Sequence, residues 1–318
     1  MNAAVVETPG QAPKYQSFPD PVAEDGEVPV RVRAAGLHPI VKGLASGSHY
    51  ASAKDKQEPS VPGIDGVGVL DDGSRVYFVF VRRPWGTMAE RAAAPRRMCI
   101  PVPEKLDDVH AAAIANPGMS AWLSLKERAA LAPGETVLIM GATGVAGQLA
   151  IQSARLLGAK RIIAAGRNVD ALATANVDAI IALDQPENAI RDALAAEAAS
   201  GIDVVVDYLW GRPTELLLEA LARGFKAQAT QRTRLVDVGS AAGRTITLPA
   251  EVLRSIDLTL LGSGFGAVAL DGILATIPTL FDMAAAGNLQ IAVEPVPLTE
   301  VESAWNRVEK GRRIVFTV

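Results

Sequence analysis

One glycine-rich stretch most constrains what this chain can fold into. Residues 136–140 are mostly apolar, Gly141, Gly144 and Gly147 follow, and a helical pattern continues to residue 157. Because glycine has no side chain, this spacing lets a backbone approach a ligand and lets the helix lie close to the strand. The free N–H groups at the helix N-terminus favour a pyrophosphate. The stretch therefore predicts a strand–turn–helix unit that binds a dinucleotide, if similar units follow it.

Those units follow between residues 137 and 286. Strands are expected at 137–140, 161–165, 179–183, 203–208, 235–238 and 258–261, and helices at 145–157, 169–175, 188–199, 213–223 and 270–286. Buried apolar strands that alternate with helices predict an α/β fold with a doubly wound parallel sheet. This context favours a pyrophosphate site over the alternative, a strand–helix unit without a ligand.

The flanking segments predict a second, β-rich domain. Short strands are expected at 1–6, 28–35 and 89–94, and a hairpin at 66–80 turns at Asp72-Gly73, so residues 1–112 favour a small barrel or curled sheet. Residues 109–115 and 120–130 are expected to be helical. The tail predicts a strand at 291–296, a helix at 299–310 opened by a Thr299–Glu302 capping box, and a strand at 314–318. Such a tail can complete the first domain, so we predict domains of 1–112 with 288–318, and of 113–287.

Composition excludes several classes of protein. The net charge is −4 and no basic block stands out, so neither nucleic acid nor an anionic membrane is an expected partner. No apolar run reaches the length of a membrane span and the N-terminus does not resemble a signal peptide, which predicts a cytoplasmic protein. Cys99 is the single cysteine and is interpreted as a small buried residue.

The segment after the second strand bears on which dinucleotide binds. An NAD site usually has Asp or Glu about twenty residues after the glycines, where it accepts a hydrogen bond from the ribose 2′-OH. Here Gly166-Arg167-Asn168 stand at this position, and Asp170 is expected to open the next helix. A guanidinium can pair with a 2′-phosphate, so we predict NADP(H) as the cofactor. The alternative is a solvated loop arginine.

Several further segments of the chain match a known family pattern. They are Ala35-Gly36-Leu37-His38-Pro39, Pro62-Gly63-Ile64-Asp65-Gly66-Val67-Gly68, Gly86-Thr87-Met88-Ala89-Glu90, Ala115-Asn116-Pro117-Gly118-Met119-Ser120-Ala121-Trp122, the 141–147 turn and residues 203–207. In these segments the chain resembles the medium-chain dehydrogenase/reductase superfamily, and specifically its zinc-free quinone oxidoreductase branch. The resemblance implies a GroES-like β domain, a Rossmann domain, a C-terminal return to the first domain, and a homodimer, for which the expected edge is near residues 256–266.

The resemblance also implies contacts with the cofactor. Asn116, Met119 and Ser120 are expected beside the nicotinamide, and Gly141, Thr143, Gly144 and Val145 beside the pyrophosphate. Gly166, Arg167 and Asn168 are expected at the adenosine ribose. Gly239, Ser240 and Ser263 are expected after the later strands, on the nicotinamide side. For each serine the alternative is a turn hydroxyl that bonds its own backbone.

A catalytic zinc is not expected. The positions that match the ligands of zinc-dependent relatives hold His38, Ile64 and Asn116, with Asp65 next to Ile64. Ile64 cannot bind zinc and Asn116 is a poor ligand, whereas a catalytic site needs three protein ligands. We predict that no metal binds.

The expected reaction is hydride transfer from NADPH to a quinone or an α,β-unsaturated carbonyl, in a cleft between the domains. His38 and Tyr50 are the candidate catalytic residues, because each side chain can donate a hydrogen bond. The alternatives are a structural hydrogen bond for His38 and packing on the cleft wall for Tyr50. A second function class also stays open, an NADPH-binding protein with regulatory or structural work and little turnover.

Overall fold

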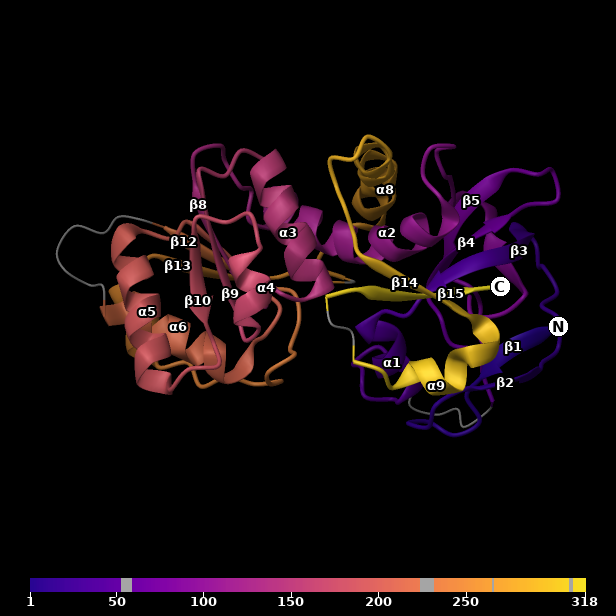
Figure 1. Cartoon of the computed structure of the whole chain (residues 1–318), viewed down its shortest axis with the longest axis horizontal. Coiled ribbons are helices and arrows are strands. Elements are labelled where there is room, and N and C mark those ends of the chain that lie inside the picture. Colours follow the sequence, from indigo (N-terminus) through magenta and orange to yellow (C-terminus); the bar gives the residue numbers. More distant parts are fainter. Residues whose placement is uncertain (53–58, 224–231, 265, 309–310) are drawn as a thin grey trace. The chain divides into compact units, whose positions relative to one another are not determined.

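The computed structural model describes residues 1–52, 59–223, 232–264, 266–308 and 311–318. The chain divides into two compact units, traced by colour in Figure 1. Unit 1 comprises Met1–Asn116 and Leu274–Val318, and unit 2 comprises Pro117–Ile273. These divisions fall inside helices α2 and α8, whereas the sequence places the boundaries at residues 112 and 287.

Most of helix α8 (Leu270–Ala285) belongs to unit 1. Its Phe281 ring is fully buried and packs edge-on against Tyr77, with 5.7 Å between the ring centroids. Tyr77 lies on strand β5 (Arg75–Val79) of unit 1. This aromatic contact is long-range, so the helical pattern of residues 270–286 alone could not reveal which unit the helix joins.

Unit 2 contains a parallel sheet with the strand order β10-β9-β8-β11-β12-β13. This order confirms the predicted doubly wound α/β fold. The inner strands β8, β9 and β11 are rich in Val and Ile and buried, as expected where helices cover both faces of a sheet, whereas β10 and β13 at the ends of the order are more exposed. Their bounds are β8 (Thr136–Met140), β9 (Arg161–Gly166), β10 (Ala179–Ala182), β11 (Val204–Asp207), β12 (Thr233–Asp237) and β13 (Leu258–Gly262).

Alternate residues of these strands form the core of unit 2. Leu138, Val205 and Leu235 pack with the apolar faces of α5 and α6, which lie side by side in Figure 1. The helices of this unit are α3 (Val145–Leu156), α4 (Val169–Ala173), α5 (Glu187–Ser200), α6 (Gly211–Arg223) and α7 (Ala250–Ser255).

The order of the strands creates a switch point between β8 and β11. These two strands are neighbours, but the chain continues from β8 toward β9 and β10, and from β11 toward β12 and β13. The crevice outside the carboxyl ends of two such strands is where open α/β sheets bind their ligands. The predicted glycine turn follows β8 and therefore lies at this edge.

Unit 1 contains a mainly antiparallel sheet of strand order β14-β15-β3-β4-β5-β7, with β6 also paired to β3. The predicted hairpin is present, because β4 and β5 pair in a register that sets Val69 opposite Arg75. Strands β1 and β2 form a separate antiparallel pair. The bounds are β1 (Asn2–Val5), β2 (Lys14–Ser17), β3 (Glu27–Gly36), β4 (Asp65–Val69), β6 (Arg91–Pro95), β7 (Cys99–Pro101), β14 (Val293–Pro297) and β15 (Arg313–Thr317).

The C-terminal tail adds to the sheet of unit 1. Strand β15 pairs antiparallel with β3 and parallel with β14. The predicted helix of residues 299–310 is wrong in extent, since α9 covers only Val301–Trp305 and follows a 3₁₀ turn, Leu298–Glu300. Glu300 is the N-cap and makes no side-chain cap bond, so the predicted Thr299 capping box does not form. Residues 309–310 of that prediction lie outside the described residues.

The helical segment around Pro117 also differs from its prediction. One helix, α2 (Asp108–Leu123), runs through Pro117 and continues into a π-helical turn, Ser124–Arg128, where two separate helices were expected. A proline inside a helix lacks the N–H that would bond the carbonyl four residues earlier, here that of Ala113, and for this reason it usually disfavours a helix that continues across it. The Ser120 hydroxyl, one turn later, donates to the carbonyl of Pro117 itself at 3.0 Å.

Candidate dinucleotide site

The glycine turn lies at the carboxyl end of β8. Gly141 has a φ of +87°, a left-handed conformation that favours glycine, and the N–H groups of Gly141 and Ala142 both donate to the Ala165 carbonyl of β9, at 2.9 and 3.0 Å. Gly144 is the N-cap of α3 and has extended backbone. The first N–H groups of α3, from Val145 onward, therefore lie at this edge of the sheet, where a helix N-terminus can bind an anion.

Gly147 and Gly144 serve different purposes in this turn. A Cβ atom at Gly147 would lie 2.3 Å from the Gly141 carbonyl oxygen and 2.7 Å from the Ala142 Cα, so α3 packs on the turn only because Gly147 has no side chain. A Cβ at Gly144 would meet only the Gly141 oxygen, at 3.4 Å. Gly144 therefore borders open space, as a position beside a bound pyrophosphate requires.

The end of β9 lies against the same turn. A Cβ at Gly166 would lie 3.0 Å from the Thr143 Cγ2 atom, so these two predicted cofactor residues are in contact. Arg167 follows and is exposed. Asn168 is the N-cap of α4, because its Oδ1 atom accepts the Ala171 N–H at 3.1 Å, and Asp170 lies in the first turn of that helix. The structure therefore gives Asn168 a capping role beside its predicted place at the ribose.

The later predicted residues lie at the same edge of the sheet. The Gly239 N–H donates to the Asp207 carbonyl at 3.2 Å, and the Ser263 N–H donates to the Asp237 carbonyl at 2.8 Å. Ser240 is exposed. Parallel strands bring their carboxyl ends to one edge, so the loops after β11, β12 and β13 adjoin one another.

The predicted nicotinamide residues Asn116, Met119 and Ser120 are half-buried residues of α2. The Ser120 hydroxyl bonds the backbone of its own helix, as the alternative interpretation of the serines expects. Burial raises the pKa of Tyr208, which follows β11, and the nearby Ser120 side chain opposes that rise, although the Tyr208 hydroxyl makes no well-aligned hydrogen bond. Ser120 therefore lies near the end of β11.

Asp207 is a residue at this edge to which the sequence analysis assigned no role. It is fully buried, and its carboxylate accepts hydrogen bonds from the Leu209 N–H at 2.8 Å, the Trp210 N–H at 3.1 Å and the Thr214 hydroxyl at 2.5 Å. Burial raises the pKa of Asp207, and these three bonds act in the opposite direction. The signal in the sequence is a carboxylate that ends an otherwise apolar strand, Val204–Asp207.

His38 is buried inside unit 1. It follows β3, precedes helix α1 (Pro39–Ala45), and none of its side chain is exposed. Its Nε2 atom lies 3.2 Å from the Asp65 Oδ1 atom, although neither ring nitrogen makes a well-aligned hydrogen bond. The Tyr77 hydroxyl donates to the other oxygen of Asp65 at 2.8 Å. This geometry is that of a buried polar cluster and supports the structural interpretation of His38.

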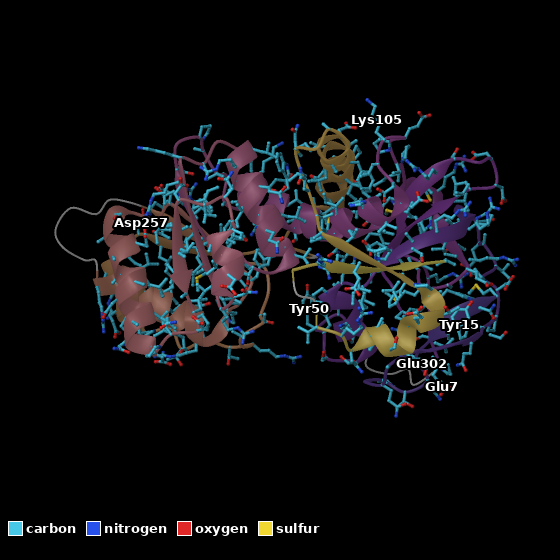
Figure 2. The ribbon with its side chains drawn as sticks, viewed as in Figure 1. Glu7, Tyr15, Tyr50, Lys105, Asp257 and Glu302 are labelled. Carbon is cyan, nitrogen blue, oxygen red and sulfur yellow. The ribbon has the colours of Figure 1, made fainter. Side chains whose placement is uncertain are left out.

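Tyr50 lies at the surface of unit 1, as Figure 2 shows. Its side chain is 74% exposed and its ring stacks on His49, with 4.2 Å between the centroids. The structure thus places one candidate catalytic residue in the core and the other at the surface.

Neither a cluster of metal-ligating side chains nor a membrane-spanning helix is present in the parts of the chain that the structure describes. Among these residues, no three His, Cys, Asp or Glu side chains are grouped so as to hold a metal ion. None of the helices in those parts combines the length and the hydropathy needed to cross a bilayer.

Comparison with known proteins places the chain in a family, although no family model matches it. It is 26% identical to the probable NADPH-dependent quinone reductase tdiC of Emericella nidulans, over 99% of each chain. It is also 30% identical to quinone oxidoreductase-like protein 2 of Bos taurus, over 78% of this chain and 70% of that protein. The chain belongs to the medium-chain dehydrogenase/reductase superfamily, in its quinone oxidoreductase-like branch.

A solved member of the same branch has a similar fold. The quinone oxidoreductase from Thermus thermophilus, whose structure was also determined as a complex with NADPH, superposes with a TM-score of 0.79. The two chains are 29% identical and each is covered completely. Within this family, unit 2 is the Rossmann domain and unit 1 is the GroES-like, β-rich domain.

Proposed function

We propose that this protein is an NADPH-dependent oxidoreductase that reduces a quinone or an α,β-unsaturated carbonyl. The observation that carries the proposal is the turn between β8 and α3, with Gly144 beside open space and Gly166-Arg167 adjoining Thr143. The printed names of the related proteins, quinone reductase and quinone oxidoreductase, agree with this assignment.

The residues of the turn fit a dinucleotide phosphate. The N–H groups at the start of α3, at Val145 and the residues after it, would bind the pyrophosphate, and the absence of a side chain at Gly144 leaves room for it. The exposed Arg167 would pair with the 2′-phosphate, and Gly166 makes room for the ribose. When bound, NADPH supplies the hydride, and the protein supplies orientation.

We further propose that the reaction is independent of zinc. Ile64 stands where zinc-dependent relatives have a ligand, and the Nε2 atom of His38 already faces the Asp65 carboxylate. Hydrogen-bond donors from side chains, backbone or water would then stabilise the negative charge that develops on the acceptor oxygen. Conjugated acceptors suit this arrangement, because they need less electrophilic assistance than a simple ketone.

A second candidate function is NADPH binding for a regulatory or structural purpose, with little turnover. It is favoured by the places of the two candidate donors, since His38 has no exposed surface and Tyr50 is largely solvated. In this case the glycine turn would bind the cofactor and no residue would assist the transfer.

Cofactor consumption distinguishes the two functions. We expect oxidation of NADPH in the presence of a panel of small quinones and enones, with a lower kcat/KM for NADH. Tight NADPH binding without turnover on any acceptor would support the second function, and equal or better use of NADH would contradict the role of Arg167. Elemental analysis tests the metal, because stoichiometric zinc that is lost together with activity would contradict a zinc-independent reaction.

A further inference from the structure

The loop after β11, residues 208–211 (the β11 loop), is held in an unusual conformation. Trp210 has a φ of +53° and Gly211 a φ of +63°, so two consecutive residues are left-handed, and a bulky residue such as Trp rarely adopts this conformation. Such a backbone persists only where its surroundings determine it. The element that determines it here is the carboxylate of Asp207.

One oxygen of Asp207 accepts both the Leu209 and Trp210 N–H groups, and the other accepts the Thr214 hydroxyl. Thr214 lies in the first turn of α6, and both side chains are fully buried. The carboxylate therefore ties the end of β11, the β11 loop and the start of α6 together. Hydrogen bonds to an ionised, buried group are among the strong ones.

The β11 loop in turn covers the first glycine of the turn. The Tyr208 N–H donates to the Met140 carbonyl at 3.1 Å, at the end of β8. A Cβ placed on Gly141 would lie 3.2 Å from both the Leu209 Cδ2 and the Tyr208 Cβ atoms. The β11 loop thus packs against Gly141 on the side where a Cβ atom would be attached.

The neighbouring loop after β12 reinforces this arrangement. The Ala241 N–H donates to the Tyr208 carbonyl at 3.2 Å, and the Ala242 N–H to the Leu209 carbonyl at 2.7 Å. Gly211 packs on Gly243 so closely that an added Cβ would lie 2.9 Å from the Gly243 backbone. A change in the conformation of the β11 loop would therefore alter the contacts of both neighbouring segments, the glycine turn after β8 and the loop after β12.

We propose that Asp207 is a positioning residue for the dinucleotide site, because its carboxylate holds the β11 loop against Gly141 and so sets the shape of the pyrophosphate turn. This inference rests on the proposed NADPH-binding function. It requires no contact between Asp207 and the cofactor. Asp207 acts through Tyr208 and Leu209 on the backbone that binds the phosphates.

The test compares three variants of the full chain. Asp207→Ala removes all three hydrogen bonds, whereas Asp207→Asn keeps an oxygen that can accept from the β11 loop. Asp203→Ala is the matched control, because the Asp203 carboxylate also accepts a backbone N–H, that of Thr136 at 2.8 Å, but just before β11, at the opposite edge of the sheet. Each variant is measured by NADPH titration and by hydrogen exchange of the protein without cofactor.

We expect Asp207→Ala to weaken NADPH binding about ten-fold or more, and to accelerate amide exchange in residues 208–211 and also in residues 141–147. Asp207→Asn should restore binding to within about three-fold of wild type, and Asp203→Ala should leave it within about two-fold. Faster exchange confined to residues 208–211, with unchanged NADPH affinity, would show that Asp207 stabilises only its own loop and would overturn the proposal.

Two further outcomes remain informative. If the wild type binds no NADPH, the proposed function fails, and the exchange of residues 141–147 in Asp207→Ala still decides whether the loop shapes the turn. If Asp207→Ala does not fold, Thr214→Val replaces it, since this variant removes one donor and keeps the carboxylate. Exchange in residues 141–147 that stays at the wild-type rate in Thr214→Val, while residues 208–211 exchange faster, would then overturn the proposal.

Discussion

Arg167 is the residue that we propose distinguishes NADPH from NADH in this protein. It is exposed, it follows the carboxyl end of β9, and Gly166 before it touches Thr143 of the glycine turn. Asp170, the nearest carboxylate along the chain, lies in the first turn of α4. We therefore expect the guanidinium to recognise the 2′-phosphate, which NADPH has and NADH lacks.

Arg167→Ala should raise the KM for NADPH about 10- to 100-fold and leave the KM for NADH nearly unchanged, because a charge-assisted hydrogen bond contributes about 1.5–3 kcal/mol. Steady-state kinetics with both cofactors measure this change. Arg155→Ala is the control, since Arg155 pairs with Asp178 at 3.0 Å, away from the turn. Equal losses with NADPH and NADH would refute a phosphate contact.

Asp237 makes stability depend on pH. Burial and the nearby Asp207 charge raise its pKa from 3.8 to about 6, and its Oδ1 atom is buried without a hydrogen-bond partner. Between these two pH values the folded protein binds more protons than the unfolded chain, so the free energy of unfolding falls as the pH rises through this interval. Above about pH 7 the carboxyl group is ionised in both states, and the free energy of unfolding falls no further.

Asp237→Asn should therefore raise the free energy of unfolding at pH 8 by about 1–2 kcal/mol, a value reduced because the side chain is partly exposed, and should have little effect at pH 4. Urea unfolding at the two pH values measures this difference. Asp257→Asn serves as the control, because Asp257 is exposed at the surface of unit 2 (Figure 2). A variant whose stability depends on pH as the wild type does would contradict the assignment.

Helix α3 is the element on which the cofactor site depends, and its two glycines predict opposite phenotypes. Gly147→Ala sets a Cβ 2.3 Å from the Gly141 oxygen, so the helix must move away from the turn. Gly144→Ala places its methyl group in open space at a φ of −73°, which alanine adopts freely. One substitution affects packing and the other affects the space for a ligand.

We expect Gly147→Ala to lose about 1–3 kcal/mol of unfolding free energy, as overpacking usually costs. Gly144→Ala should remain within about 1 kcal/mol of wild type, the cost of alanine at an N-cap, but should bind NADPH at least about ten-fold more weakly. Urea unfolding and NADPH titration separate the two effects. Normal NADPH affinity in Gly144→Ala would mean that the pyrophosphate does not lie beside this residue.

At the scale of the whole molecule, strand β13 predicts how two copies associate. It is a terminal strand of the sheet in the described part of unit 2, and its central Leu260 is 36% exposed. An edge strand presents unpaired backbone groups that can pair with a second copy across a two-fold axis. We therefore propose a homodimer, as expected from the family resemblance.

Light scattering should give a mass of twice 33.3 kDa for the wild type and of a single chain for Leu260→Glu, since a buried charge disfavours the interface. Ile180→Glu is the matched control, because Ile180 is 44% exposed on β10, at the opposite end of the strand order. A monomeric wild type, or dissociation by the control substitution alone, would refute an interface at β13.

Local patterns in the sequence determined the elements of unit 2 and the composition of its turn. Apolar runs separated by helical patterns correctly predicted β8 to β13, because such runs are recognised from neighbouring residues along the chain alone. The spacing of Gly141, Gly144 and Gly147 indicated the turn for a similar reason, because glycine allows backbone conformations and close approaches that other residues do not. The Thr299 cap and the division of residues 109–130 into two helices were wrong, because capping patterns and helix bounds are weak local signals.

Only the tertiary structure decided the roles of residues whose surroundings come from distant segments. The pairing of His38 with Asp65, to which Tyr77 donates, and the bonds from Asp207 to its loop could not be inferred from the sequence. Most of helix α8 belongs to unit 1, where its Phe281 ring packs on Tyr77 of β5, a contact between distant segments. Burial and hydrogen-bond partners depend on residues far apart in the chain, whereas strand, turn and helix patterns depend on neighbouring residues. The sequence alone therefore determined the glycine turn, and only the tertiary structure decided the surroundings of these side chains.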